Sequence, residues 1–385
     1  MHVLLITIGS HGDVHPFIGL GLALKSRGHQ VTFATNDYFR PLAKRAGFDD
    51  FISLGSADEY SMMAKMPELW ESSRGVKLIF EFISRGFEDI YKIVAHHHAS
   101  HPADGVVVSS SLCLGARVAQ DKLKFPMATV HLSPSILRSV INPAKLPGLF
   151  MPPWFPYWIK AAMWRAADRY GIDPIVCPNL NEFRAKHNLA PVKRPLKDWW
   201  HSPDLVLGMW PEWFGPMQPD WPSQTVLCGF PLYDERELEA MPPDLIAFLD
   251  AGEKPIAFTP GSAMWRGEEF FKASVEACRK LNRRGLLLSR HADHIPPNLP
   301  AGVLHVPYAP FSQLLPRVAA LVHHGGIGTT SQALAAGTPQ LIMAMSHDQP
   351  DNAFKVERLG VGLAIRPARY LRGGAAKSLA RLLGN

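Results

Sequence analysis

The opening residues alternate between short apolar runs and longer stretches with helical spacing. Residues 3–8 form a continuous apolar run, which is typical of a strand buried on both faces of its sheet. After residues 9–13, apolar positions recur three or four apart, and this spacing predicts a helix that ends near Gly28. A second strand is expected at residues 31–34. The order strand, helix, strand predicts a parallel sheet.

The same alternation continues along the chain in two series. The first series predicts further strands at residues 106–108, 127–130 and 205–209. Residues 229–243 are expected to link it to a second series, with strands at 256–259, 286–288, 303–306, 320–322 and 340–343 and a helix at 376–383. At 385 residues the chain is long enough for two domains. We therefore expect an α/β protein of two doubly wound, Rossmann-like lobes with a cleft between them.

Between residues 134 and 225 the composition changes to proline and tryptophan. Dense prolines keep regular structure short. The tryptophans allow two interpretations: ordinary core residues, or an aromatic wall for an apolar ligand. The second interpretation predicts a wide apolar pocket in the first lobe, which binds a hydroxylated acceptor. Its lining would consist of residues 154–164, including Trp154 and Trp158, together with Met62, Met63, Leu78, Phe82 and Phe87.

Composition narrows the class of protein. Apolar residues make up 47% of the chain and charged residues 19%, which suits two packed cores. No apolar stretch approaches the roughly 20 residues of a membrane span, and the start lacks a signal-peptide pattern. The four cysteines are too scattered for a disulfide framework or a zinc site. We therefore expect a cytoplasmic protein.

The net charge adds a preference for anionic partners. A formal charge of +6 suits an anionic ligand or the inner face of a membrane. Nucleic acid is not expected, because the lysines and arginines are spread singly. His96, His97, His98 and His101 raise the question of a metal site, but adjacent side chains on a helix point in different directions. A solvated helix end is preferred, and no metal is expected.

The most informative stretch is His-His-Gly-Gly-Ile-Gly-Thr-Thr at residues 323–330. It follows an apolar strand and opens a helical pattern. Glycines there let backbone N–H groups approach a ligand, and a helix N-terminus offers free donors and partial positive charge to a phosphate. Neither the Walker loop nor the dinucleotide-binding fingerprint fits. The stretch predicts a phosphate site, with a purely structural glycine turn as the alternative.

These residues resemble the donor-binding signature of the family 1 nucleotide-sugar glycosyltransferases. The likeness consists of the run at 324–330, Gly-Thr-Pro at 337–339, and Asp348-Gln349 at the spacing of that signature. Residues 8–20 and 27–33 extend it over nearly the whole chain. Within the family, the likeness is strongest to the rhamnosyltransferases of bacterial rhamnolipid synthesis and to related sterol and macrolide enzymes. It rests there on residues 210–214, 220–222, 229–232 and 308–310.

The resemblance implies a GT-B fold, in which residues 1–230 bind the acceptor and residues 231–385 bind the donor. It also implies inverting, metal-independent transfer of a sugar from a UDP- or dTDP-sugar, which serves as co-substrate with no other cofactor. Tyr308 would stack on the nucleobase, the turn would hold the diphosphate, and Asp348 and Gln349 would bind sugar hydroxyls. The implied donor-binding residues are Ser262, Tyr308, Ala309, His323, His324, Gly326, Gly328, Thr329, Thr330, Gln332, Asp348 and Gln349. A helix-capping role is the alternative for Asp348.

The sequence departs from the family pattern in three places. Gln332 replaces a glutamate that holds the ribose in many members, and Ala344 replaces a common proline. A closing helix that returns to the first lobe has no counterpart before Asn385, so the chain is expected to be truncated or modified there.

The resemblance places the catalytic base in the first lobe. Asp13 matches the position of the family's catalytic histidine, which some bacterial members replace with an aspartate. A general base must remove the proton of the attacking hydroxyl as the new bond forms. His11 and His15 are the alternative bases, and a helix cap is the alternative role for Asp13. Ser109–Ser111 stand where histidine-type members hold a supporting aspartate, which favours an aspartate that acts alone.

Two competing functions follow from the same residues. A non-catalytic partner protein would bind a nucleotide sugar or a lipid without turnover, but it would not need both Asp13 and Asp348-Gln349. A sugar-nucleotide epimerase would share the two lobes, but it would not need an apolar acceptor wall. These residues therefore favour a glycosyltransferase.

Overall fold

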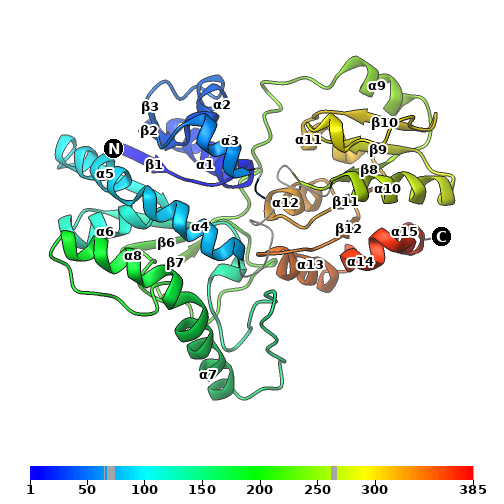
Figure 1. The fold of residues 1–385 in the computed structure, drawn as a ribbon. Coiled ribbons are helices and arrows are strands. Elements are labelled where there is room, and N and C mark those ends of the chain that lie inside the picture. The colour runs from blue at the N-terminus through cyan, green and yellow to red at the C-terminus, as the bar shows by residue number, and fades with distance from the viewer. Residues whose placement is uncertain (65, 67–73, 262–266, 385) are drawn as a thin grey trace. The chain divides into compact units, whose positions relative to one another are not determined.

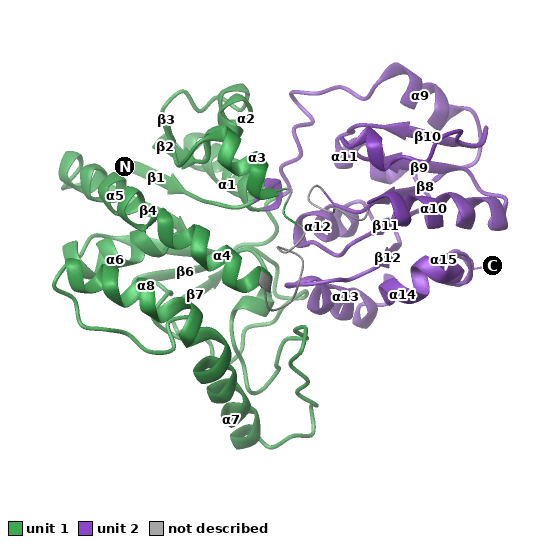
Figure 2. Cartoon of the chain, viewed as in Figure 1, with its two compact units in different colours: residues 1–9, 13–231 green, residues 10–12, 232–385 purple. Residues whose placement is uncertain are grey.

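The computed structural model describes residues 1–64, 66, 74–261 and 267–384. The chain forms two compact units, one of residues 1–9 and 13–231 and the other of residues 10–12 and 232–385 (Figure 2). Within the described residues, the long segment between β7 and α9 carries no helix or strand, as expected for a linker. Ser262, one of the expected donor-binding residues, lies outside the described residues.

The described part of the first unit contains a seven-stranded, all-parallel sheet in the order β3-β2-β1-β4-β5-β6-β7 (Figure 1). The strands are β1 (His2–Ile6), β2 (Gln30–Thr35), β3 (Phe51–Ser53), β4 (Gly105–Ser110), β5 (Met127–His131), β6 (Leu205–Gly208) and β7 (Thr225–Leu227). The sequence pattern did not predict β3 and β7. Each is an edge strand of three residues, which is too short to show a periodicity.

Helices cover both faces of this sheet. They are α1 (His11–Lys25), α2 (Arg40–Arg45), α3 (Ala57–Ala64), α4 (Arg74–Arg85), α5 (Phe87–Ser100), α6 (Leu114–Leu123), α7 (Tyr157–Ala167) and α8 (Asp173–Lys186). Successive strand residues point to opposite faces. Leu4 and Ile6 therefore pack with α5 and α6, while Leu5 packs against Gly21 of α1.

The described part of the second unit contains a six-stranded, all-parallel sheet in the order β10-β9-β8-β11-β12-β13. Its strands are β8 (Ile256–Thr259), β9 (Gly285–Leu288), β10 (Val303–Val306), β11 (Ala320–His323), β12 (Gln340–Ile342) and β13 (Gly362–Ala364). Its helices are α9 (Pro243–Asp250), α10 (Gly267–Leu281), α11 (Phe311–Leu314), α12 (Ile327–Ala335), α13 (Gln349–Arg358), α14 (Pro367–Arg369) and α15 (Ala375–Leu382). The expected strands are all present, and β13 is a further short edge strand.

Two hydrophobic clusters fill the faces of the second sheet. Phe258 points to the face covered by α10 and α15, where Phe270 stacks on Tyr370 with ring centroids 5.2 Å apart. Ala257 points to the other face and packs with Leu245 of α9 and Ala333 of α12. A parallel sheet covered on both faces is the doubly wound architecture that the sequence predicted.

Both sheets reverse their strand order at one position. In the first unit the reversal lies between β1 and β4, and in the second it lies between β8 and β11. Loops that follow the two strands beside a reversal lead away in opposite directions, and ligands of open α/β sheets bind there. Asp13 follows β1, and the turn at residues 324–326 follows β11. Each candidate loop therefore lies at the position where such a sheet places its ligand.

The histidines near the end of α5 are only partly solvated, which corrects the expectation of a solvated helix end. His96 is exposed, but His97 is buried and its pKa is lowered by that burial. Throughout the part of the chain that the structure describes, no cluster of three histidine, cysteine or acidic side chains is arranged to hold a metal ion.

None of the described helices is long and apolar enough to cross a membrane.

Candidate functional site

The turn after β11 has a backbone that only glycine tolerates. Gly325 has a φ of +91°, and a Cβ atom there would lie 2.7 Å from Cγ2 of Ile342. Gly326 is the N-cap residue of α12 and makes no side-chain cap. The first N–H groups of a helix have no partner within the helix. The turn therefore directs backbone donors and the positive end of the helix dipole toward one place.

His323 supports this turn from below. It is fully buried, its Nδ1 accepts the Gly325 N–H at 3.1 Å, and its Nε2 lies 3.0 Å from Oε1 of Gln340. This pattern assigns the Nε2–H tautomer, which donates to Gln340. Burial lowers the pKa of His323 to about 3, so the ring is neutral at physiological pH. The expectation that His323 contacts the donor is corrected: it positions the turn, because both ring nitrogens are engaged by the protein.

His324 lies on the other side of the turn, against two glycines. A Cβ atom would approach its ring to 2.6 Å at Gly261, which follows β8, and to 2.4 Å at Gly326. The buried Nδ1 has no hydrogen-bond partner among the described residues. Burial lowers the pKa of His324 to about 4, so the imidazole is neutral and offers one N–H donor. An unpartnered polar atom beside a helix N-terminus is suited to an anionic ligand.

The first turn of α12 places the remaining predicted phosphate-site residues. A Cβ atom at Gly328 would meet nothing within 4 Å, so the helix surface there is open. Thr329 is half-buried, whereas Thr330 is fully buried and its Oγ1 lacks a partner among the described residues. Gln332 is buried on the same helix. The structure brings these residues together, and their contacts with a nucleotide stay predictions.

Asp348 is linked to the turn by the side chain of Asn352, which binds both. Asp348 is the N-cap residue of α13 but makes no side-chain cap, which disfavours the capping alternative. Nδ2 of Asn352 donates to Oδ2 of Asp348 at 2.8 Å and to the carbonyl oxygen of Gly325 at 2.9 Å. Asn352 is fully buried and was missed by the sequence analysis. Its spacing of four residues after Asp348 on a helix is the signal that could have identified it.

Gln349 holds the preceding loop instead of presenting its carbonyl oxygen to a ligand. Its Oε1 accepts the N–H of Met345 at 2.9 Å and of Ser346 at 3.2 Å, and the residue is buried. His347, directly before Asp348, adopts a left-handed backbone with a φ of +55°. This bend is uncommon outside glycine, and such residues gather at functional sites. The protein thus engages the side-chain oxygen of Gln349, and the expectation that Gln349 binds a sugar hydroxyl stays a prediction.

Tyr308 follows β10, and its side chain is fixed by a hydrogen bond through its hydroxyl group. Its hydroxyl donates to the carbonyl oxygen of Asp234 at 2.6 Å, and Oδ2 of Asp234 accepts the Ser312 N–H at 2.6 Å. Burial, followed by the charge of Glu235, raises the pKa of Tyr308. The guanidinium of Arg290 lies 4.8 Å from the centroid of the Tyr308 ring. The sequence analysis did not identify Arg290. The next residue, Ala309, is buried.

Asp13 lies in the first turn of α1, at the strand reversal of the first unit. A Cβ atom at Gly9 would lie 2.3 Å from Oδ2 of Asp13, so the carboxylate rests against the Gly9 backbone, whose φ is +130°. The Gly12 N–H donates to Oγ of Ser10 at 3.2 Å, so Ser10 provides a cap at this helix end. This bond satisfies one of the free N–H groups of the helix, and the capping alternative for Asp13 stays open.

Two buried titratable side chains lie near enough to Asp13 to respond to its charge. Burial raises the pKa of Cys113 to about 12, and the negative charge of Asp13 adds to that effect. The pKa of Tyr60 is also raised, by burial first and then by Tyr38 and Asp13. His11 and His15 lie in the same helical turn region and are half-buried. Ser109 is buried at the end of β4 and pairs in register with Ile6 of β1, so the Ser109–Ser111 segment lies beside the start of the Asp13 loop.

The predicted acceptor residues do not enclose one pocket among the described residues. Met62, Trp154 and Trp158 are exposed, by 62%, 78% and 71%. Phe87 is a core residue that packs with Leu114 and Phe183, because it lies on the inner side of α5. Phe82, Leu78 and Met63 are half-buried, and the Arg85 guanidinium lies 4.9 Å from the Phe82 ring. The core position of Phe87 corrects its expected place in the pocket lining, and acceptor contacts by Met62, Phe82, Trp154 and Trp158 stay a prediction.

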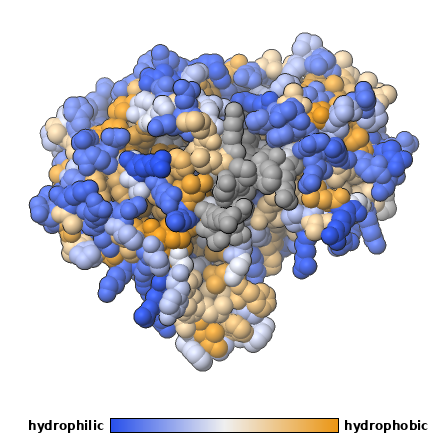
Figure 3. Space-filling view, in the orientation of Figure 1, coloured by the Kyte–Doolittle hydropathy of each residue, from blue (hydrophilic) through white to orange (hydrophobic). Residues whose placement is uncertain are grey.

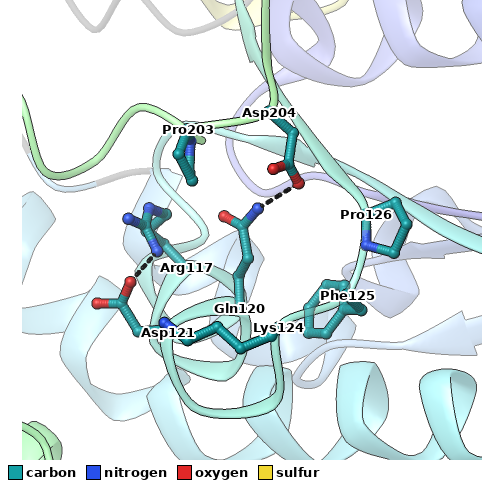
Figure 4. Close-up of a pocket in the computed structure, with 8 residues that line it drawn as sticks. All are labelled: Arg117, Gln120, Asp121, Lys124, Phe125, Pro126, Pro203 and Asp204. Carbon is teal, nitrogen blue, oxygen red and sulfur yellow. Dashed lines mark hydrogen bonds and ion pairs between the residues drawn. The ribbon is translucent and has the colours of Figure 1, made fainter.

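A cavity of about 280 Å³ lies elsewhere in the first unit, at the amino ends of β5 and β6 (Figure 4). Arg117 pairs with Asp121, and Gln120 donates to Asp204 at 2.8 Å, so its polar side chains largely bind one another. It occupies the sheet edge opposite the loops that follow β1 and β4. We therefore do not assign it to the candidate site. Its lining residues are Arg117, Gln120, Asp121, Lys124, Phe125, Pro126, Pro203 and Asp204.

Replacement of Asn352 tests the link between the turn and Asp348. Asn352→Ala removes two buried hydrogen bonds and is expected to lower the stability of the chain by about 1–3 kcal/mol. Urea unfolding of the full chain measures this loss. The control is Asn179→Ala, because Asn179 makes its hydrogen bond to Ser84 at an exposed position and should cost less than about 0.5 kcal/mol. Equal losses for the two variants would show that Asn352 has no special role.

Comparisons with known proteins agree with this arrangement. Residues 3–142 match the glycosyltransferase family 28 N-terminal domain, and residues 287–385 match the erythromycin biosynthesis protein CIII-like C-terminal domain. O-mycaminosyltylonolide 6-deoxyallosyltransferase of Streptomyces fradiae is 30% identical over 97% of this chain and 86% of its own length. Vancomycin aglycone glucosyltransferase of Amycolatopsis orientalis is also 30% identical, over 94% of this chain and 86% of its own. A sterol 3-beta-glucosyltransferase of Pichia angusta is 27% identical over 98% of this chain and 30% of its own length.

Solved structures share the fold over the whole chain. The glycosyltransferase of kitacinnamycin has a TM-score of 0.73 at 19% identity, and covers 100% of this chain and 91% of its own. Spinosyn rhamnosyltransferase SpnG, complexed with thymidine diphosphate, has a TM-score of 0.68 at 17% identity, and covers 100% of this chain and 92% of its own. The narrower likeness to rhamnolipid rhamnosyltransferases stays a prediction. The two units, their sites at the strand reversals and these relatives show that the chain is a glycosyltransferase of the GT-B fold and belongs to family 1.

Proposed function

We propose that this chain transfers a sugar from a UDP- or dTDP-sugar to a hydroxyl group of an apolar, macrolide- or sterol-like acceptor. Transfer proceeds with inversion at the anomeric carbon and without a metal ion, and Asp13 acts as general base. One observation carries the donor assignment: His324 packs between Gly261 and Gly326, beside the N-terminus of α12, and its Nδ1 has no hydrogen-bond partner among the described residues. This places a neutral donor and helix N–H groups at a strand reversal, the arrangement that binds a diphosphate.

The donor side supplies charge stabilisation. The imidazole N–H of His324 and the N–H groups at the start of α12 would donate to the diphosphate. These donors gain strength as negative charge develops on the leaving group, and they are already held in place by His323 and Asn352. Asp348 would accept a hydrogen bond from a sugar hydroxyl, and Tyr308 with Arg290 would face the nucleobase.

The acceptor side supplies the base. As the acceptor oxygen bonds to the anomeric carbon, its proton passes to the Asp13 carboxylate. The bond between the anomeric carbon and the phosphate oxygen breaks, and its electron pair leaves with the nucleoside diphosphate. Attack from the face opposite the leaving group inverts the anomeric centre. The choice of an apolar acceptor is supported by the names of the relatives, which include an O-mycaminosyltylonolide 6-deoxyallosyltransferase and a sterol 3-beta-glucosyltransferase.

The first test concerns the donor. dTDP or UDP, added in the presence of EDTA, is expected to raise the melting temperature, because a ligand that binds only the folded chain stabilises it by mass action. His324→Ala should remove most of this shift. Each variant is compared with its own ligand-free melting temperature, and His96→Ala, an exposed histidine on α5, serves as the control. An undiminished shift in His324→Ala, or a strict requirement for magnesium, would contradict the assignment.

The second test concerns the reaction and the acceptor. With a radiolabelled dTDP- or UDP-sugar, label is expected to appear on a sterol or macrolide aglycone in preference to free glucose in a competition assay. Apolar acceptors gain roughly 25 cal/mol per Å² of buried apolar surface before ordering costs are subtracted. Unchanged donor would indicate a binding protein, and an isomerised donor would indicate an epimerase. Preferred transfer to the free sugar would refute the apolar acceptor.

The third test concerns Asp13. Asp13→Asn is expected to lower turnover about a hundredfold or more, the usual scale for loss of a general base. The dTDP-induced thermal shift should remain, because the donor turn belongs to the second unit. His15→Ala should reduce turnover far less, and Ser10→Ala should lower stability while folded protein keeps its activity. Near-normal turnover by folded Asp13→Asn would assign the base to His11 or His15 instead.

A further inference from the structure

The most exposed large apolar side chains of the described residues gather in one short segment. Phe150, Trp154, Tyr170 and Trp158 are 79%, 78%, 76% and 71% exposed, and Tyr157 between them is 60% exposed. These five residues, which we call the aromatic tip, lie on and around α7. Helix α7 extends away from the sheet of the first unit (Figure 1), and apolar residues dominate the corresponding lower end of the surface view (Figure 3).

The aromatic tip is held rigidly by buried polar contacts. Asp168, at the end of α7, is fully buried, pairs with Arg138 and accepts from Nε of Arg194 at 2.6 Å. Lys160 is buried and its Nζ donates to the carbonyl oxygen of Pro153 at 3.0 Å. Trp164, unlike its exposed neighbours, is buried. The aromatic tip is therefore exposed on a segment whose side chains Lys160, Trp164 and Asp168 are buried against the first unit.

The exposed charged side chains of the stretch that carries the tip are positive, whereas Arg138 is paired with Asp168 and Lys160 is buried. Between Asp121 and Asp168 the sequence contains no aspartate or glutamate, while it contains six lysines and arginines: Lys122, Lys124, Arg138, Lys145, Lys160 and Arg165. Arg165 and Arg169 are exposed on the same helical segment as the tip. The guanidinium of Arg169 lies 5.6 Å from the Tyr170 ring centroid. The tip therefore combines large aromatic side chains with exposed cations and contributes no exposed carboxylate from this stretch.

We propose that the aromatic tip docks this glycosyltransferase on an anionic lipid surface. Tryptophan and tyrosine have an apolar ring and a polar group, and they favour the boundary between lipid and water. Arginine side chains beside them attract anionic headgroups. The proposal does not rest on the proposed acceptor or on Asp13. Docking on a lipid surface would bring the enzyme close to an apolar acceptor, because such a molecule dissolves in lipid.

Charge also decides against a second copy of the chain as the occupant. A symmetric dimer would place the same surface on both subunits, because a two-fold contact is self-complementary. Such a contact would gather Arg165 and Arg169 of both copies in one interface, to which residues 122–167 contribute no carboxylate. Anionic headgroups supply the missing negative charge.

Vesicle sedimentation of the full chain tests the proposal. The protein is expected to sediment with vesicles of phosphatidylcholine and phosphatidylglycerol, to bind phosphatidylcholine alone much less, and to dissociate as salt is raised. W154S/W158S and R165E/R169E should each weaken binding to the anionic vesicles about tenfold or more. The matched control is Trp213→Ser, since Trp213 is 54% exposed in the same unit but lies outside the tip.

The remaining measurements separate this proposal from its rivals. All variants should keep the dTDP-induced thermal shift, which reports the donor site independently of the tip. No binding of the wild type to anionic vesicles at low salt, or equal weakening in Trp213→Ser, would overturn the proposal. So would a dimer in sedimentation velocity that W154S/W158S abolishes, which would identify a second copy. Unchanged vesicle binding with a raised KM for a detergent-solubilised acceptor would also overturn it, and would assign the tip to the acceptor site.

Discussion

The reversal of strand order in two all-parallel sheets is the constraint on which both candidate sites depend. A parallel sheet presents the carboxyl ends of its strands at one edge, and the loops beside a reversal diverge. In the first unit this opens the space that Gly9 and Asp13 occupy. In the second unit it separates the loop with Gly261 from the turn with Gly325 and Gly326, and the ring of His324 fills that separation. Asp13 and His324 therefore lie where topology leaves room for a ligand.

Buried neutral groups hold the glycine turn at residues 324–326 in shape. His323 accepts the Gly325 N–H, and Asn352 donates to the Gly325 carbonyl oxygen. The peptide groups before and after Gly325 are therefore both held by a side chain. Both side chains are fully buried, and a charged group in either place would pay a large desolvation cost. The depressed pKa of His323 follows from this requirement. Because Asn352 also binds Asp348, the glycine turn and the Asp348 carboxylate are positioned by one side chain.

The first unit distributes its charges differently. Asp168 is buried between Arg138 and Arg194, and Asp121 pairs with Arg117 and with Arg184. Removing one member of such a pair leaves an uncompensated buried charge, so these pairs fix the helices and loops they join. The result is a stiff support for α7, on which the most exposed aromatic side chains stand. The buried ion pairs of Asp168 and the exposed aromatic side chains thus belong to the same segment around α7.

The sequence by itself determined the α/β class, the two series of strands, the glycine turn after β11 and the position of Asp13 after β1. These features are encoded locally, in runs of four to eight residues and in glycines whose backbone no other residue adopts. Periodicity did not reveal β3, β7 and β13, because three residues at a sheet edge carry too little pattern.

Only the tertiary structure separated His323 from His324. The first ends a strand and points into the sheet toward Gln340, and the second begins a turn and packs on Gly261. It likewise placed Trp164 in the core and Trp154 and Trp158 in solvent, and it assigned Asn352 to the donor turn. In each case the deciding partner is distant in the chain or on another element. A side chain's role depends on that partner, and local sequence does not specify it.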